Sequence, residues 1–322
     1  MKQVIIFTAL VALSVNAFTQ TQKITAMHTL PSFNKELFPF ESKWMNINGN
    51  PVHYIDEGEG DIILFSHAVI GASFMYREFV KQLRTHFRVI IMDFPGFGLS
   101  GYTPAYQFTF VSQAKILQQF IERLQLEDIT LVGHDSPSGL LVAAWQPELF
   151  KAFILTDTQI FPSDEYKRIH KLVNMAGGNF FQGFNRLTNF LTWGSMKFGM
   201  PTKKFTRAER KEYYKMSKGK IRRTAPGKIL RSIRTERDAM VQVKTAFETN
   251  LNTKPVLMIY GEKDPVNKLG IPGRMKKMLP HSTLHLVPKE KHFPHEGRAV
   301  LMSLLIYRWM HEMTEKNRLV LH

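Results

Sequence analysis

Short apolar runs that alternate with amphipathic stretches constrain the fold of this chain more than any other feature of its sequence. The runs that predict strands are rich in Ile, Val, Leu and Phe, and they occupy residues 61–68, 87–94, 128–134, 151–158, 254–266 and 282–288. Stretches with helical periodicity lie at residues 73–86, 109–126, 138–147 and 298–315. Near-continuous apolar strands separated by helices are typical of a parallel sheet that is buried on both faces. The sequence therefore predicts an α/β fold, with a mostly parallel sheet and helices on both faces.

Two further features organise the chain along its length. The alternating stretch from Lys43 to Gly58 surrounds Asn48-Gly49, a pair that is typical of a tight hairpin. After Pro162 the alternation of strands and helices gives way to basic, helix-prone sequence, and it resumes at Lys254. We therefore expect one α/β core formed by residues 43–162 and 252–316, with a helical cap inserted as residues 163–251. A chain of 322 residues with 44% apolar residues is long enough to bury such a core.

The N-terminus is a different kind of sequence. Met1-Lys2 precedes an apolar segment from Val4 to Val15, and small residues follow it. This pattern predicts a signal peptide at residues 1–17, and therefore export to the periplasm or secretion, with residues 18–42 as an N-terminal extension. The alternative is an uncleaved anchor, but the apolar segment is shorter than the roughly 20 residues of a spanning helix. The chain has no cysteine, which excludes disulfide bonds and thiolate metal sites.

The positive charge is concentrated in the expected cap. The whole chain carries a formal charge of +16, and residues 163–250 contain 20 Lys and Arg against seven Asp and Glu. Such a segment attracts anionic surfaces, so a weak contact with anionic membranes is expected, although a solvated basic face is the simpler interpretation. The aromatic residues Phe205, Tyr213 and Tyr214 do not form the pattern of a stacking platform, so no nucleic-acid partner is predicted.

Polar residues stand where the predicted strands end. They are His67, Asp135, Asp157, Asp264 and His292, each after a different apolar run. Ligands of open α/β sheets bind beyond the carboxyl ends of the strands, which makes these residues the candidates for a site. A nucleophile, an acid and a histidine in this chain order are the components of a catalytic triad.

Four motifs support a resemblance to a known family. They are "DFPGFGLS" (93–100), "LVGHD" (131–135), "GEKDPV" (261–266) and "KHFPHE" (291–296). In this order and spacing, residues 43–316 resemble the α/β-hydrolase superfamily, in particular its epoxide hydrolase and haloalkane dehalogenase branch, and the resemblance is weakest over the cap. It implies an α/β-hydrolase fold and a small-molecule substrate.

The resemblance implies a covalent mechanism. Asp135 stands where this branch has its nucleophile, while esterases of the same fold have serine there. A carboxylate that attacks an sp³ carbon forms an ordinary ester, which water activated by His292 would then hydrolyse. Asp264 would orient His292, with Asp157 as the alternative acid. The expected substrates are small hydrophobic epoxides or haloalkanes.

The same resemblance assigns further roles in handling the leaving group. The backbone N–H groups of Val69 and Ser136 would form the oxyanion hole. Haloalkane dehalogenases have a halide-binding tryptophan directly after the nucleophile, and Ser136 in its place favours epoxide opening. Tyrosines of the cap would then protonate the opening ring, and the candidates by residue type are Tyr166, Tyr213 and Tyr214. Trp193, also in the cap, is the candidate donor to a leaving halide.

Three positions depart from the family pattern. Ala68 and Ile70 replace a glycine and a proline of the oxyanion loop, and Pro137 replaces the glycine behind the nucleophile. Proline biases the residue before it away from the helical region, so the Ser136 N–H could be redirected and the reaction slowed. Two alternatives therefore stay open: a catalytically weak hydrolase fold that acts as a binding protein, and an esterase-type acyl hydrolase.

Neither a cofactor nor a metal is predicted. The glycines of "GFGLSG" (96–101) have dinucleotide-binding spacing, but "YTPAY" follows in place of a helix. His285, His292 and His295 lack the paired carboxylates of a metal site. The sequence does not indicate an oligomeric state.

Overall fold

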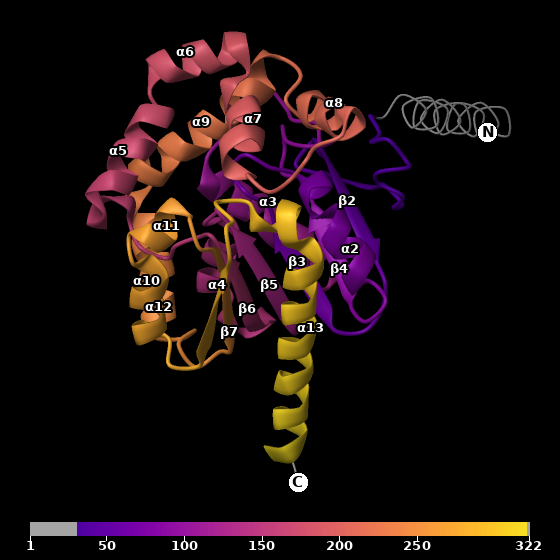
Figure 1. Ribbon diagram of the computed structural model, residues 1–322, viewed down its shortest axis with the longest axis vertical. Coiled ribbons are helices and arrows are strands. Elements are labelled where there is room, and N and C mark those ends of the chain that lie inside the picture. The colour runs from indigo at the N-terminus through magenta and orange to yellow at the C-terminus, as the bar shows by residue number, and fades with distance from the viewer. Residues whose placement is uncertain (1–30, 321–322) are drawn as a thin grey trace, which may run out of the picture. The chain divides into compact units, whose positions relative to one another are not determined.

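The computed structural model describes residues 31–320, and Asn34 onward forms one compact unit built on an eight-stranded sheet (Figure 1). The predicted signal peptide, residues 1–17, lies outside the described residues. The strands in chain order are β1 (Lys43–Ile47), β2 (Asn50–Glu57), β3 (Ile62–Ser66), β4 (Arg88–Met92), β5 (Ile129–His134), β6 (Phe150–Thr156), β7 (Val256–Gly261) and β8 (Ser282–Val287). Their order in the sheet is β1-β2-β4-β3-β5-β6-β7-β8. β2 pairs antiparallel with β1 and β4, and every other pair is parallel, which confirms the predicted mostly parallel sheet.

The predicted hairpin joins β1 to β2. Asn48 and Gly49 have φ angles of 51° and 80°, which are the positive values that a type I′ turn requires. The Asn46 side chain accepts a 2.8 Å hydrogen bond from the Gly49 N–H, and Ile47 pairs with Asn50 across the turn. Local sequence therefore determines this register.

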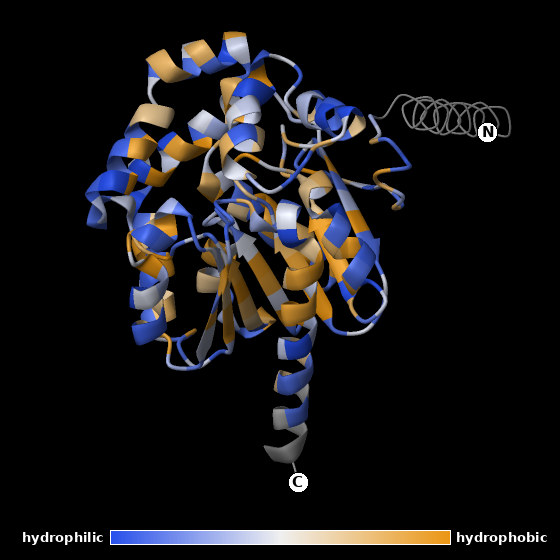
Figure 2. Cartoon of the chain, viewed as in Figure 1, coloured by the Kyte–Doolittle hydropathy of each residue, from blue (hydrophilic) through white to orange (hydrophobic). Residues whose placement is uncertain are grey.

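Helices cover both faces of the sheet. On one face α2 (Arg77–Leu83), preceded by the 3₁₀ turn η1 (Ser73–Tyr76), packs against the C-terminal helix α13 (Pro294–Val320). On the other face α3 (Phe110–Leu124), α4 (Ser138–Trp145) and α10 (Arg237–Glu248) pack side by side. Two short helices, α11 (Pro265–Lys268) and α12 (Ile271–Met278), lie between β7 and β8. Figure 2 shows the apolar residues concentrated in the strands, and all residues of β5 and β7 are buried.

The segment between β6 and β7 is helical and lies over the carboxyl edge of the sheet (Figure 1). Besides α10 it contains α5 (Lys167–Ala176), α6 (Asn179–Thr188), α7 (Phe190–Gly194), α8 (Arg207–Met216) and α9 (Lys220–Thr235), with the short turns η3 (Ser163–Glu165) and η4 (Ser195–Gly199). α9 packs against α5 and α6. We call this group of helices, α5 to α9, the cap. No helix among the described residues is long and apolar enough to cross a membrane.

Capping residues define where several helices begin. Thr206 and Glu209 form a reciprocal capping box at the start of α8, since each side chain accepts from the other residue's backbone N–H. Thr109 accepts from the Ser112 N–H at the start of α3. α13 begins at Pro294, earlier than the predicted residue 298, and its φ angle of −136° at Arg298 interrupts the helix there.

Candidate active site

Asp135 occupies a sharp turn between β5 and α4. Its φ angle is 44°, a region that residues other than glycine rarely adopt. A Cβ added to Gly139 would lie 2.9 Å from the Ser66 Cβ, so glycine is required for the first turn of α4 to pack this closely on the end of β3. The turn holds the carboxylate next to the N-terminus of α4, where the helix dipole favours negative charge. Backbone strain of this kind is often found at functional sites.

The structure brings Asp135, His292 and Asp264 into one hydrogen-bonded series. The Nε2 atom of His292 lies 3.2 Å from Asp135 Oδ1, and its Nδ1 atom lies 2.7 Å from Asp264 Oδ2. Asp264 is fully buried, and its other oxygen accepts a 2.6 Å hydrogen bond from the Val266 N–H. The Asp135 side chain is 30% exposed, so it is accessible to a ligand. This geometry is that of a nucleophile, a base and an orienting acid.

The charge state of His292 depends on both carboxylates. Burial lowers the pKa of His292, but the negative charge of Asp135, that of Asp264 and the hydrogen bonds to both raise it. The net result is a pKa well above the usual 6.5. With both carboxylates ionised, His292 is therefore an imidazolium between two anions.

Asp157, the alternative acid, has a different environment. It follows β6 with a φ angle of 44° and is fully buried. Its Oδ1 atom accepts a 2.8 Å hydrogen bond from the Gly261 N–H, while Oδ2 has no partner among the described residues. Burial, and next the charge of Asp264, raise the pKa of Asp157 well above its usual value, so this carboxyl is held neutral. The hydrogen bond to His292 comes from Asp264.

The two candidate oxyanion donors, Val69 and Ser136, are buried residues of the loop after β3 and of the turn after β5. Val69 and Ser136 are each 1% exposed, and neither backbone N–H donates to another residue in the described part of the chain. His67, before this loop, accepts a hydrogen bond from the Phe94 N–H through Nε2 and contacts the Ala68 carbonyl oxygen through Nδ1. His67 therefore shapes the loop rather than facing a substrate.

Asp93 organises the loops beside the site, a role that the sequence did not reveal. Its buried carboxylate accepts hydrogen bonds from the Ser73 N–H (2.7 Å) and the Leu99 N–H (2.9 Å), and it lies 2.8 Å from His53 Nδ1. Burial raises the pKa of Asp93, but the hydrogen bond and charge of His53 outweigh it, so the net shift is downward. Gly98 has a φ angle of 49°, and a Cβ there would lie 2.2 Å from the Asp93 Cγ. Glycine is therefore required where the loop closes over this carboxylate.

The four candidate cap donors lie in different environments. The hydroxyl of Tyr213, which is buried, donates to Glu296, and that of Tyr166 lies 3.3 Å from Arg274 Nη1. Tyr214 is 40% exposed, and Trp193 is 41% exposed with its ring edge-on to Phe198. None of the four has a described hydrogen bond to Asp135 or His292.

Sequence reasoning also missed the partner of Tyr213. Arg77 is fully buried, and its guanidinium forms ion pairs with Glu296 at 2.6 Å and with Glu209 at 2.7 Å. Burial lowers the pKa of Arg77, but the two carboxylates and Tyr213 raise it above its usual value. The available signal was an arginine among the large apolar and aromatic residues of "FMYREFV" (74–80). We call Arg77, Glu209, Tyr213 and Glu296 the buried ion cluster.

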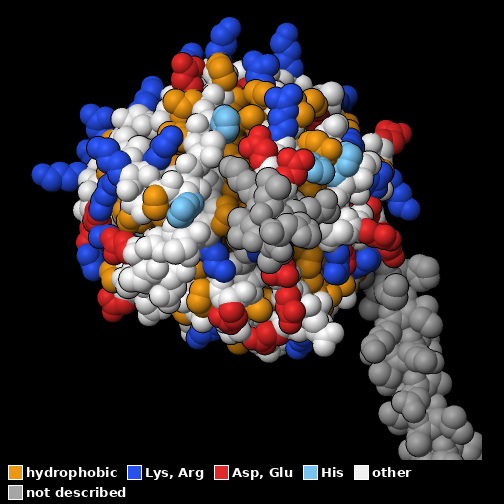
Figure 3. Space-filling view, turned by 90° about the horizontal axis from the view of Figure 1, so that it is seen from below, with side chains coloured by type: hydrophobic (Ala, Val, Ile, Leu, Met, Phe, Trp, Pro, Cys, Tyr) orange, Lys and Arg blue, Asp and Glu red, His pale blue; other side chains and the backbone are white. Residues whose placement is uncertain are grey.

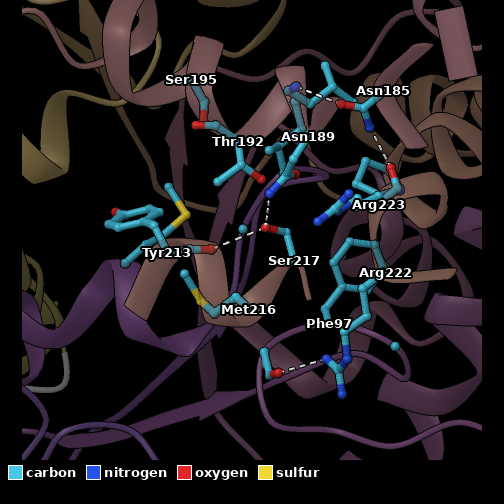
Figure 4. Close-up of a pocket in the computed structure, with 17 residues that line it drawn as sticks. Phe97, Asn185, Asn189, Thr192, Ser195, Tyr213, Met216, Ser217, Arg222 and Arg223 are labelled. Carbon is cyan, nitrogen blue, oxygen red and sulfur yellow. Dashed lines mark hydrogen bonds between the residues drawn. The ribbon is translucent and has the colours of Figure 1, made fainter. Parts of the chain in front are cut away.

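A small cavity of about 40 Å³ lies between the core loops and the cap. Its described lining includes Ile70 and Phe97 of the core, but none of Asp135, Asp264 and His292. Figure 4 shows the cap side chains that surround it, among them Arg222, whose guanidinium donates to the Gly98 and Ser100 carbonyl oxygens, both at 2.7 Å. The cap is therefore fastened to the loop that Asp93 organises.

The alpha/beta hydrolase fold family matches residues 61–299 of this chain. Together with the eight-stranded sheet, this match shows that the chain belongs to the α/β-hydrolase fold family and is a hydrolase.

Several named proteins are similar to this chain. The chain is 27% identical over 267 residues to haloalkane dehalogenase 2 of Mycobacterium tuberculosis, and the aligned region covers 81% of this chain and 92% of that protein. It is 29% identical over 181 residues to cis-3-alkyl-4-alkyloxetan-2-one decarboxylase of Shewanella oneidensis, covering 53% and 57% of the two chains. A loop variant of the haloalkane dehalogenase DbeA from Bradyrhizobium elkanii has the same fold, with a TM-score of 0.76 at 16% identity over 87% of this chain and 99% of that one. The chain is thus an α/β hydrolase that is similar to haloalkane dehalogenases.

Proposed function

We propose that this enzyme hydrolyses small hydrophobic substrates through a covalent ester between Asp135 and an sp³ carbon. The observation that carries this proposal is the placement of a carboxylate, rather than a hydroxyl, in the strained turn 3.2 Å from His292. Attack of a carboxylate on an ester carbonyl would give a high-energy anhydride, whereas attack on an sp³ carbon gives a stable ester. The geometry therefore favours alkyl transfer over esterase chemistry.

The two steps share the residues of the triad. In the first, an Asp135 oxygen forms a bond to the carbon while the carbon–halogen or epoxide carbon–oxygen bond breaks; a halide leaves, whereas an epoxide oxygen stays on the substrate as an alkoxide and takes a proton from solvent. In the second, His292 removes a proton from water and the resulting hydroxide attacks the ester carbonyl carbon. The bond from this carbon to the oxygen that carries the substrate then breaks, and the alcohol departs with that Asp135 oxygen and the proton returned by His292. Asp264 holds the Nδ1 proton and stabilises the imidazolium.

Charge provides the link between these steps. The Asp135 charge is the larger of the two electrostatic causes that raise the pKa of His292. When Asp135 becomes a neutral ester, this cause disappears and the pKa of His292 falls. His292 can then release its proton and act as a base only after the ester has formed.

The hydrogen-bond donors proposed for the leaving atom favour an oxygen, so we prefer epoxides as substrates. The nearby candidates for stabilising the departing atom are the backbone N–H groups of Val69 and Ser136, which suit an oxyanion. Trp193 is exposed and packs on Phe198, which does not suit a halide ligand. Haloalkanes are the second candidate substrates, because a relative of which this chain covers 92% is named a haloalkane dehalogenase.

The covalent intermediate can be trapped by removing the base. His292→Ala, and the more conservative His292→Gln, should accumulate an adduct at Asp135 that peptide mass spectrometry locates. An epoxide adds its full mass, while a haloalkane adds its alkyl group with loss of the hydrogen halide, so the mass also identifies the leaving group. The control is Asp135→Asn introduced into each of the two His292 variants, and these double variants should gain no mass. Failure of every epoxide and haloalkane to label Asp135, with turnover retained by the unmodified enzyme, would contradict the proposal.

A further inference from the structure

The outer surface of the cap carries exposed apolar side chains that the active site does not use. On α6, Phe180, Phe184 and Leu187 are 93%, 44% and 76% exposed. Their spacing of four and three residues places them on one face of the helix. Leu172 and Met175 of the neighbouring α5 are 51% and 55% exposed. Exposed apolar side chains gathered on one helix face mark interaction surfaces, and we call Phe180, Phe184 and Leu187 the apolar stripe.

The charge around the apolar stripe has one sign. Residues 167–235 contain 18 Lys and Arg and two acidic residues, Glu209 and Glu212. Both glutamates are buried, with exposures of 6% and 5%, so this segment exposes cations without neighbouring anions from its own sequence. The face opposite the cap is different, because Asp and Glu side chains lie there among Lys and Arg (Figure 3). The basic character therefore belongs to the cap rather than to the whole surface.

A cavity of about 370 Å³ opens between α6 and α9, and Asn179, Gln182 and Arg186 line it from a different face of α6 than the one that carries the exposed apolar side chains. Its charged lining residues are all cationic: Arg186, Lys220, Lys228 and Arg231. Arg231 is oriented by hydrogen bonds to the Gly177 carbonyl oxygen, at 2.9 Å, and to the Asn179 side chain. A cavity of this charge suits a phosphate group.

We propose that the cap docks on an anionic lipid bilayer, with the apolar stripe in the interface and the Lys and Arg side chains of the cap against lipid phosphates. An amphipathic helix with exposed Phe and Leu beside Lys and Arg has the composition of helices that lie in membrane interfaces. A polyanion such as nucleic acid would match the charge but leave the stripe in water. A second copy of the chain would bring two basic surfaces together. Only the bilayer matches both features, and this inference is independent of the proposed reaction.

Co-sedimentation of the full chain with vesicles tests the docking. Binding to vesicles that contain phosphatidylglycerol should exceed binding to pure phosphatidylcholine vesicles and should weaken as salt is raised. The double variant Phe180→Ser/Leu187→Ser should lower the partition coefficient about tenfold or more. Val300→Ser/Leu304→Ser on α13, where the side chains are 67% and 44% exposed, is the matched control and should leave binding unchanged.

A second pair of variants tests the charge. Arg186→Gln/Lys220→Gln should weaken binding to the anionic vesicles and flatten its dependence on salt. Equal binding to both kinds of vesicle would overturn the proposal. Vesicle binding that survives Phe180→Ser/Leu187→Ser would also overturn it. If deletion of residues 1–17 then abolished the binding, the N-terminus would be the binding segment. If heparin competed with it, the binding site would be one for polyanions.

Discussion

Among single residues, the two candidate acids, Asp264 and Asp157, differ in their hydrogen bonds rather than in how near they lie to His292. Asp264 and Asp157 both lie at buried strand ends near His292, and the charge of Asp264 is one reason why the pKa of Asp157 is raised. Asp264 bonds to His292 Nδ1, whereas Asp157 accepts from the Gly261 N–H and its pKa is raised. Of these two neighbouring carboxyls, only Asp264 thus has a hydrogen bond to the His292 ring.

This difference predicts opposite outcomes for two isosteric substitutions. Asp264→Asn should lower kcat by about 10³- to 10⁴-fold, because an amide does not stabilise the imidazolium or select its tautomer. Asp157→Asn should change kcat by less than about threefold, because an amide resembles the protonated carboxyl and can still accept from Gly261. Steady-state kinetics of both variants on the substrate that labels Asp135 provides the measurement. A large loss in Asp157→Asn with a small one in Asp264→Asn would reverse the assignment.

At the scale of secondary-structure elements, the buried ion cluster joins three helices from distant parts of the chain. Arg77 belongs to α2, Glu209 and Tyr213 to the cap helix α8, and Glu296 to α13. Removal of one member of a buried ion pair leaves an uncompensated charge away from water. The cluster therefore fastens the cap to the helices that cover one face of the sheet.

The expected result is a large loss of stability when the cluster is broken. Glu296→Gln should lower the free energy of unfolding by about 3 kcal/mol or more, because Arg77 loses its bidentate partner. Urea denaturation followed by circular dichroism measures the change. The control is Asp61→Asn, which breaks the exposed 2.6 Å pair with Lys151 and should cost less than about 1 kcal/mol. Similar losses in both variants would show that the cluster has no special role.

The elements themselves were largely predictable, because their signals are local. The run predicted as a strand at residues 128–134 is β5, Ile129–His134, and Asn48-Gly49 forms the predicted turn. The strand ends likewise indicated Asp135 and His292, which the structure places in contact. The buried ion cluster was not predictable, since Arg77 and Glu296 are 219 residues apart and meet only because α2 packs against α13. For the same reason the partner of the Tyr213 hydroxyl could not be read from its sequence neighbours.

At the scale of the whole molecule, buried histidines link stability to pH. His67, His134 and His295 are buried, and burial lowers the pKa of each, that of His295 to about 3. In the unfolded chain these side chains titrate near pH 6.5. Between the two pKa values the unfolded state binds more protons, so stability is present above about pH 6.5 and is lost as the pH falls. His292 has the opposite shift, so its contribution is present below pH 6.5 and is lost as the pH rises through its higher pKa in the folded state.

The His295 contribution can be isolated with one variant. Its ring stacks on Tyr76 with centroids 5.0 Å apart. When the pH is lowered from 6.5 to 5, the free energy of unfolding should fall in both proteins. The fall should be about 1.5 kcal/mol larger in the unmodified protein than in His295→Gln, because glutamine does not titrate. Urea unfolding of both proteins at the two pH values measures this difference. Equal pH dependence would show that His295 does not contribute.

If Asp135 is the nucleophile, the oxygen of the product alcohol comes from its carboxylate. A single turnover in ¹⁸O-labelled water, with enzyme in excess over an epoxide or haloalkane, tests this origin. The first product should retain unlabelled oxygen from the Asp135 carboxylate, and mass spectrometry of the peptide should find ¹⁸O in Asp135. Label in the newly formed hydroxyl of the product, with none in Asp135, would show direct attack by water and contradict the covalent mechanism.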